Sequence, residues 1–265
     1  MWTDVEPRLH SLKQFHSRPL IDIRAEYGYI FTKISGHNDL TRMVASFQRL
    51  SCVIFDIDGT LTRTNELIFA SFNHVADKYL GKTLTRPEII ALFGPPEEGG
   101  LAKLLGEREA VTAMEDLCSF YDDHHDEMAS LHSGIEELLS FLKSQGVKLA
   151  IFTGKGKRTT EITLRALNIA HYFDLIVCGT DVLHHKPHPE GIQKVISEFN
   201  LDPSEVLMVG DALSDVKASR SAGVRVAAAV WDSYDRERLL HAGADFVFHD
   251  PIEMLTWFRE HQRIT

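Results

Sequence analysis

The chain has 265 residues, of which 44% are hydrophobic and 25% charged, so it can bury a substantial core in one or two domains. Its formal net charge of −10 argues against nucleic acid or an anionic membrane as the main partner, because long-range electrostatic forces would be repulsive. A small anion in a local basic pocket is compatible with this charge. No stretch reaches the ~18 consecutive apolar residues of a membrane span, and residues 1–50 lack the apolar region of a signal peptide. We therefore expect a soluble, cytoplasmic protein.

Three cysteines, Cys52, Cys118 and Cys178, are scattered along the chain without the paired spacing of a metal site. Free cysteines are often buried and behave as small hydrophobic residues. We expect three buried free thiols in a reducing compartment.

Residues 1–50 are predicted to form an N-terminal extension of unknown role. Residues 27–32 are aromatic and β-branched, which is typical of a strand, and residues 39–50 have the pattern of an amphipathic helix. We expect this extension to pack on the core domain or to mediate self-association, with a homodimer as the simplest form.

An apolar strand that stops at two carboxylates is the most informative feature of the sequence. Residues 53–55 suit a strand buried on both faces, and Asp56 and Asp58 follow it one residue apart. Gly59 and Thr60 then predict a tight turn with free backbone amides. A buried ionised carboxylate is costly without a cation or donors, so the pair indicates chemistry in which one group attacks and the other moves a proton. A simple turn with Asp56 as a helix cap is the alternative.

Short apolar runs alternate with amphipathic stretches from Ser51 onward, which is typical of an α/β fold with a doubly wound, Rossmann-like parallel sheet. The predicted strands are residues 52–56, 147–152, 175–178, 206–209, 225–230 and 246–248. About 90 residues separate the first two strands, far more than one crossover helix requires. We therefore predict a core domain of residues 51–62 and 134–265, and a helical cap domain of residues 63–133.

Specificity is expected to come from the inserted cap, because loops and caps carry specificity on a rigid core. The loop of residues 93–98 contains Gly-Pro-Pro and is our candidate for a segment that faces the site. Arg86, Lys103 and Arg108 could reach an anionic group, but solvated helix faces are the favoured interpretation. Residues 121–126 contain histidines and acids, and we interpret them as a polar helix face rather than a second metal site.

A hydroxyl and glycine-flanked lysines follow the second strand of the core, in the sequence Thr153-Gly154-Lys155-Gly156-Lys157. Exposed amides at the start of a helix favour anions, so this segment predicts an anion site. The alternatives are a simple threonine cap and a solvated basic face. The spacing does not match a Walker phosphate loop, and we do not infer nucleotide binding from it.

Lys186 follows the third strand and is flanked by Pro187 in the sequence His184-His185-Lys186-Pro187-His188. Proline restricts the neighbouring backbone, and a lysine ammonium suits a phosphoryl oxygen or crowded carboxylates. A surface lysine before a helix is the alternative. The histidines do not predict zinc, because no cysteine or carboxylate completes a ligand set locally.

The fourth strand also ends in carboxylates. Asp211 and Asp215 stand four residues apart, where a helix is expected to begin. Acids there also offset a helix dipole, which is the simpler explanation. Two strands that both end in acids, without histidine or cysteine, favour a hard cation with oxygen ligands, namely Mg²⁺.

The order and setting of these motifs resemble the haloacid dehalogenase superfamily, over residues 51–248. The helical insert resembles the alpha-helical cap subtype, close to phosphoglycolate phosphatase-like and pyrophosphatase-like members. The resemblance implies that Asp56 is a nucleophile that forms an aspartyl-phosphate and that Asp58 is the general acid and base. It also implies a Mg²⁺ site, with Asp56, the main-chain carbonyl of Asp58 and Asp211 as ligands and Asp215 either as a further ligand or as an acid that supports the ligands. The implied phosphate-binding residues are Thr153, Gly154 and Lys186.

The resemblance implies a phosphatase that hydrolyses a small phosphorylated metabolite. Asp58 argues against the dehalogenase and phosphonatase branches, which lack this acid. The sugar phosphomutase branch has a histidine ten residues after its second aspartate, where this chain has Ile68, and Arg63 replaces an acid common after the first motif. Hydrolysis is therefore favoured over mutase chemistry, and an inorganic pyrophosphatase stays an alternative.

A phospho-accepting receiver domain or a silent scaffold protein is less compatible with the sequence, because a large cap and all motif residues are present. Many relatives have a proline-rich hinge where the cap returns to the core, and this chain has residues 131–134 there instead. The resemblance therefore does not predict how the hinge moves or how it controls access to the site.

Overall fold

The computed structural model describes residues 50–261, which belong to one compact unit spanning Gln48–Thr265. The predicted extension of residues 1–50 therefore lies outside the described residues, apart from Leu50. Among the described residues, no helix combines the length and the apolar character needed to cross a bilayer.

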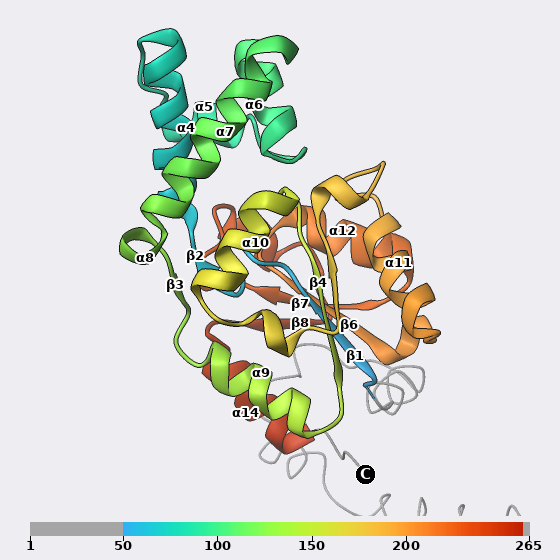
Figure 1. Ribbon diagram of the computed structural model, residues 1–265. Coiled ribbons are helices and arrows are strands. Elements are labelled where there is room, and N and C mark those ends of the chain that lie inside the picture. The colour runs from blue at the N-terminus through green and yellow to red at the C-terminus, as the bar shows by residue number, and fades with distance from the viewer. Residues whose placement is uncertain (1–49, 262–265) are drawn as a thin grey trace, which may run out of the picture. The chain divides into compact units, whose positions relative to one another are not determined.

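A six-stranded parallel sheet in the order β5-β4-β1-β6-β7-β8 forms the core (Figure 1). All six predicted strands are confirmed, with ends that differ by at most one residue. They are β1 Cys52–Phe55, β4 Lys148–Phe152, β5 Leu175–Val177, β6 Val206–Gly210, β7 Arg225–Ala229 and β8 Phe246–Phe248. β1 lies at the centre, with Phe55 paired to Ile151 of β4 and to Val209 of β6. Because these three strands are parallel, their carboxyl ends meet at one edge.

Helices cover both faces of the sheet, since alternate side chains of a strand point to opposite faces. Val53 and Phe55 pack into one hydrophobic cluster with α9 (Ile135–Ser144) and α14 (Pro251–His261). Cys52 and Ile54 pack into another cluster with α11 (Glu190–Phe199) and α12 (Leu213–Ala222). In Figure 1 these helix pairs lie on opposite sides of the sheet. The core helices are α9 Ile135–Ser144, α10 Lys157–Ala166, α11 Glu190–Phe199, α12 Leu213–Ala222, α13 Arg236–Leu240 and α14 Pro251–His261, with short 3-10 turns η2 Ala170–Tyr172, η3 Gly179–Asp181 and η4 Pro203–Glu205.

The long segment between β1 and β4 is helical, as predicted, and extends beyond the sheet in Figure 1. Its helices are α4 Asn65–Leu80, α5 Arg86–Ile90, α6 Glu97–Leu105, α7 Glu107–Asp123 and α8 His125–Met128. Two short antiparallel strands, β2 Thr62–Arg63 and β3 Ser130–Leu131, form the stem through which this segment leaves and rejoins the core.

The inserted helices form a second hydrophobic cluster, built mainly from α4, α6 and α7 and joined by Ile162 of α10. Local signals set several ends: Gly81 closes α4 in the left-handed conformation, at φ 63°, and Thr85 with Glu88 forms a capping box at the start of α5. The three cysteines are free and buried, as predicted. A parallel sheet with an inserted helical segment is therefore the observed architecture.

Candidate active site

The predicted motif residues lie at the carboxyl edge of the sheet. Asp56 follows β1, Thr153 and Gly154 follow β4, and Asp211 follows β6. Lys186 comes from the loop between η3 and α11, and Asp215 from the first turn of α12. The site thus draws on segments up to 159 residues apart in the sequence, since it extends from Asp56 to Asp215.

Three carboxylates converge at this edge. Oxygen atoms of Asp56, Asp211 and Asp215 lie within 4.8 Å of one another. The Asp215 side chain is fully buried, and Asp211 is also buried. Burial, together with the charge of the neighbouring acids, raises the pKa of Asp211 well above its usual value, and burial raises the pKa of Asp215 to about 6. Such a cluster needs a cation to be fully ionised.

Lys186 supplies one positive charge to this cluster of carboxylates. Its Nζ lies 2.7 Å from Asp215 Oδ1 and 3.1 Å from Asp56 Oδ2, and its side chain is 5% exposed. Burial alone would lower the pKa of Lys186, but the two carboxylates outweigh burial and raise it. The ammonium also lies 4.8 Å from the centroid of the Phe152 ring. Lys186 therefore stays charged beside Asp56.

The donor set fits a small hard cation. All three side-chain ligands are carboxylates, which Mg²⁺ prefers, and one ammonium does not neutralise three negative charges. Two glycines make room for the acids: a Cβ atom on Gly59 would stand 2.5 Å from Asp211 Oδ2, and one on Gly210 would stand 2.3 Å from Asp215 Cγ. Gly59 also has a positive φ of 77°. The close packing of backbone and carboxylates thus requires glycine at both positions.

Asp58 occupies a different environment from Asp56. Thr64 Oγ1 donates a hydrogen bond to Asp58 Oδ1 at 2.5 Å, and Lys155 Nζ lies 3.3 Å from Asp58 Oδ2. Burial raises the pKa of Asp58 above its usual value, while Lys155 and the Thr64 hydroxyl oppose that rise. A carboxyl group whose pKa is raised in this way is suited to hold and release a proton.

Thr153 and Gly154 begin the loop after β4, where a ligand can meet backbone amides. Thr153 is buried, its backbone nitrogen donates to Val177 O at 3.1 Å, and its Oγ1 accepts a hydrogen bond from Lys155 N at 3.2 Å. Gly154 lies against the next loop, because a Cβ on Gly179 would stand 2.4 Å from Gly154 O. The loop is therefore held at a defined position beside β1.

Lys155 is a residue that the sequence interpretation did not single out. The sequence left a solvated basic face as an alternative for residues 153–157. For Lys155 this alternative is wrong, because its side chain is fully buried. Its Nζ lies 3.6 Å from Glu97 Oε1 and 4.4 Å from the ring centroid of Tyr121. Its position two residues after Thr153, between two glycines, is the one local signal that could have drawn attention to it.

The interpretation of residues 121–126 as a polar helix face is also wrong in part. Tyr121 and His125 are both buried, and Tyr121 Oη shares a hydrogen bond of 2.9 Å with Thr163 Oγ1 of α10. Burial raises the pKa of Tyr121 to about 12, and burial lowers the pKa of His125. Both side chains therefore stay neutral and pack between the inserted helices and the core. Residues that looked polar were buried because α7 and α8 lie against α10.

The loop of residues 93–98 lies against the loops of the site. A Cβ on Gly179 would approach Pro96 Cγ to 2.8 Å, and Glu97 bonds to the start of α10. Phe93 packs against Phe69 and against Tyr234 of the core, each at 6.4 Å between ring centroids. This placement agrees with the prediction that the loop faces the site.

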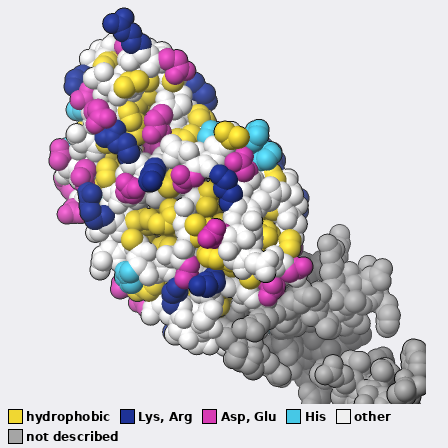
Figure 2. Space-filling model, turned by 45° about the vertical axis from the view of Figure 1, so that its right-hand side comes forward, with side chains coloured by type: hydrophobic (Ala, Val, Ile, Leu, Met, Phe, Trp, Pro, Cys, Tyr) yellow, Lys and Arg dark blue, Asp and Glu magenta, His cyan; other side chains and the backbone are white. Residues whose placement is uncertain are grey.

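The basic residues of the insertion stay on solvated surfaces. Arg86 forms an exposed ion pair with Glu66 at 2.7 Å, and Lys103 and Arg108 are exposed. These positions agree with the favoured interpretation of solvated helix faces. In the face shown in Figure 2, charged side chains of both signs are interspersed.

A carboxylate does stand near the histidines of the loop that carries Lys186, contrary to the sequence interpretation. Donor atoms of His184, His188 and Glu190 lie within 4.8 Å of one another. However, Glu190 already accepts hydrogen bonds from the backbone nitrogens of Leu183 and His184, each at 3.0 Å. Its carboxylate therefore braces the loop.

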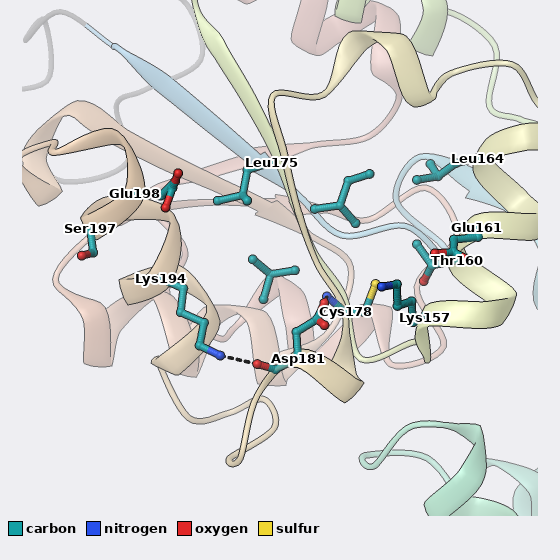
Figure 3. A pocket seen from close by; sticks show the side chains of 12 residues that line it. Lys157, Thr160, Glu161, Leu164, Leu175, Cys178, Asp181, Lys194, Ser197 and Glu198 are labelled. Carbon is teal, nitrogen blue, oxygen red and sulfur yellow. Dashed lines mark hydrogen bonds between the residues drawn. The ribbon is translucent and has the colours of Figure 1, made fainter.

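A separate hollow of about 580 Å³ lies over the edge strand β5, between α10 and α11 (Figure 3). Its lining includes Lys157, Cys178 and Lys194. Lys194 Nζ donates a hydrogen bond to the carbonyl oxygen of Asp181, and none of the carboxylates described above lines the hollow. The hollow is therefore distinct from the candidate active site.

Comparison with known proteins identifies the family. The model of the haloacid dehalogenase-like hydrolase family matches residues 53–229, which is more than half of the chain. The chain belongs to the haloacid dehalogenase-like hydrolase family. As a member of this family it is a hydrolase of the phosphatase type, and the family implies a phosphorylated small molecule as substrate.

Sequence relatives of this hydrolase include a pyrophosphatase. The protein named Pyrophosphatase PpaX of Bacillus cereus is 34% identical over 207 residues, which cover 78% of this chain and 95% of the relative. The PpaX of Bacillus thuringiensis has the same identity and coverage.

Solved structures agree with the fold. A predicted phosphoglycolate phosphatase from Haemophilus somnus superposes with a TM-score of 0.70 at 24% identity, covering 78% of this hydrolase and 97% of that chain. A Thermotoga maritima protein assigned as a β-phosphoglucomutase superposes with a TM-score of 0.64 at 32% identity, covering 80% and 99%.

Proposed function

We propose that this hydrolase is a Mg²⁺-dependent phosphatase that removes phosphate from a small monoester, phosphoglycolate-like or related, through an aspartyl-phosphate on Asp56. The observation that carries the proposal is the Lys186 ammonium held between Asp56 and Asp215, beside Asp211. A carboxylate can attack a phosphate group only if the negative charges of both are offset.

The metal would be held by the side chains of Asp56, Asp211 and Asp215 and by the main-chain carbonyl of Asp58. When bound, Mg²⁺ offsets the charge of the phosphoryl group and of the attacking carboxylate. Lys186 adds a second positive charge, and Thr153 with the Gly154 amide would bind the phosphoryl oxygens. The buried setting of these groups strengthens their electrostatic effect.

In the first step an Asp56 carboxylate oxygen forms a bond to phosphorus, and the bond from phosphorus to the leaving oxygen breaks. Asp58 donates its proton to that oxygen, so an alcohol departs. In the second step Asp58 accepts a proton from a water molecule whose oxygen bonds to phosphorus. The bond to Asp56 then breaks, which releases phosphate and restores both aspartates.

Phosphate release from 4-nitrophenyl phosphate, with and without Mg²⁺, tests the proposal. We expect Mg²⁺-dependent turnover that Asp56→Asn abolishes while the circular dichroism spectrum and thermal unfolding stay those of a folded protein. Turnover that is unchanged in Asp56→Asn would contradict the proposal. No turnover in the wild type would favour a receiver or scaffold protein instead.

Pyrophosphate is the second candidate substrate, and the 34% identity with proteins named Pyrophosphatase PpaX supports it. A panel of phosphoglycolate, sugar phosphates, nucleotides and pyrophosphate, compared by kcat/KM, separates the two. A mutase role is disfavoured because Ile68, at the position of the mutase histidine, packs against the hydrophobic cluster of the inserted helices. Self-association as a homodimer stays a prediction, which light scattering during gel filtration would test.

A further inference from the structure

The fully buried ammonium of Lys155 contacts both carboxylate oxygens of Asp58, the proposed proton carrier. Lys155 Nζ lies 3.3 Å from Asp58 Oδ2 and 3.4 Å from Oδ1, while Thr64 Oγ1 bonds Oδ1 at 2.5 Å. With both oxygens held, the Asp58 carboxyl group has little freedom to rotate. Neither of these two partners is part of the proposed metal site.

Lys155 is itself firmly placed. Its backbone nitrogen donates to Thr153 Oγ1 at 3.2 Å, and its carbonyl oxygen accepts from Gly179 N at 2.8 Å. The Tyr121 ring covers the ammonium at 4.4 Å from the ring centroid. A side chain fixed at both ends can hold a neighbouring group within the narrow limits that proton transfer requires.

The remaining partners of Lys155 come from the inserted helices. Glu97 of α6 lies 3.6 Å from Nζ, and Tyr121 belongs to α7, whereas Asp58 belongs to the core. A buried ammonium is costly unless it is paired, so Glu97 and Asp58 share the task of compensating it. The arrangement around Asp58 is therefore complete only while the inserted helices lie against the core.

We propose that Lys155 is a positioning residue that holds the Asp58 carboxyl group for proton transfer to the leaving oxygen, and that Glu97 makes this positioning depend on closure of the inserted helices. This inference rests on the proposed function, since it assigns a role within the same site. Lys155 does not bind the phosphoryl group in this scheme. It acts only through Asp58.

The dependence of rate on the leaving group distinguishes this role from a general structural one. A poor leaving group needs a proton, whereas a good one departs without it. We would measure kcat/KM for phenyl, 4-nitrophenyl and 2,4-dinitrophenyl phosphates, because kcat/KM covers the steps up to departure of the phenol. Wild type, Lys155→Met, Lys155→Arg and Asp58→Asn would be compared.

We expect Lys155→Met to lose about 10- to 100-fold with phenyl phosphate and less than about 3-fold with the dinitrophenyl ester, a pattern that resembles Asp58→Asn. Lys155→Arg, which keeps the charge, should recover most of the loss. In the Asp58→Asn background, Lys155→Met should add little, because the group on which it acts is already gone. An equal loss with all three esters, or a full additional loss in the double variant, would overturn the inference.

The role of Glu97 in coupling this positioning to closure is tested by a separate pair of variants. Glu97→Gln should show the same leaving-group pattern to a smaller degree, whereas the adjacent Glu98→Gln should match the wild type. Equal behaviour of the two variants would overturn the role of Glu97. Wild-type turnover that Asp56→Asn abolishes establishes the proposed function separately, so a failure of the Lys155 tests would not be confused with a failure of that function.

Discussion

The carboxylate of Glu97 accepts a hydrogen bond of 2.6 Å from the backbone nitrogen of Gly156, the residue that precedes α10. Its other oxygen accepts from Thr159 Oγ1 at 2.6 Å. A side chain of the inserted segment thus satisfies free donors at the start of a core helix, where negative charge is also favoured by the helix dipole. Gly156 permits this approach, since a Cβ there would stand 2.8 Å from Glu97 Oε2.

Gly156→Ala should therefore destabilise the protein by crowding two glutamates of α6. The φ of Gly156 is −68°, which alanine adopts without strain, so the added methyl acts only by pushing against Glu97 and Glu98. We expect the free energy of unfolding to fall by about 1–3 kcal/mol in urea titrations. In a Glu97→Ala background the same change should cost less, and an equal cost in both backgrounds would argue against the contact.

Gly59→Ala should weaken the metal site. The new Cβ would stand 2.5 Å from Asp211 Oδ2, so the carboxylate must move, and the Mg²⁺ concentration for half-maximal activity should rise about 10-fold or more. Gly81→Ala is a matched control: Gly81 also has a positive φ, at 63°, but a Cβ there meets nothing within 4 Å. It should lower stability by about 1 kcal/mol, because alanine is disfavoured at a positive φ, and leave the Mg²⁺ requirement unchanged. A similar Mg²⁺ response in both variants would contradict this explanation.

The three cysteines should resist alkylation in the folded protein. Burial raises the pKa of Cys52 to about 12 and those of Cys118 and Cys178 to about 11, so little thiolate exists at pH 8. Mass spectrometry after iodoacetamide treatment should find no modification in native buffer and three modified thiols in guanidinium chloride. Fast labelling of Cys178 in native buffer would show that the hollow over β5 opens to solvent.

Glu190 should stabilise the loop that carries Lys186 at neutral pH and lose this effect in acid. Hydrogen bonds from the backbone nitrogens of Leu183 and His184 lower the pKa of Glu190 from 4.5 to about 2. A lowered folded-state pKa means that its stabilising contribution is present above pH 4.5 and is lost as the pH falls toward 2. Hydrogen exchange of the Leu183 and His184 amides should accelerate over this range relative to the intrinsic rates.

The Glu190→Gln variant should remove that extra pH dependence. Glu198→Gln, an exposed change on the same helix, should retain it. Identical exchange profiles in the wild type and Glu190→Gln would show that the carboxylate does not brace the loop.

The strands and the acids that follow them could be predicted because they depend on local pattern. Runs such as residues 52–55 are apolar throughout, which is how a strand covered on both faces must be composed. Since parallel strands end at one edge, the motifs that follow β1, β5 and β6 meet there, as the distances between Lys186, Asp56 and Asp215 show.

The burial of Lys155, Tyr121 and His125 could not be predicted in the same way. A lysine between glycines and a run of histidines and acids have the composition of a solvated surface. They are buried because α7 and α8 pack against α10 and Glu97 of α6 bonds to its start, and that packing depends on contacts between residues far apart in the chain.

The sequence by itself therefore determined the parallel sheet, the helical insertion and the edge at which Asp56, Asp58 and Asp211 stand. These follow from apolar periodicity and from the order of the segments. Only the tertiary structure decided which charges share a buried space. Lys155 lies between Asp58 and Glu97 because the inserted helices fold back onto the core, and a buried ammonium in that space requires both carboxylates near it.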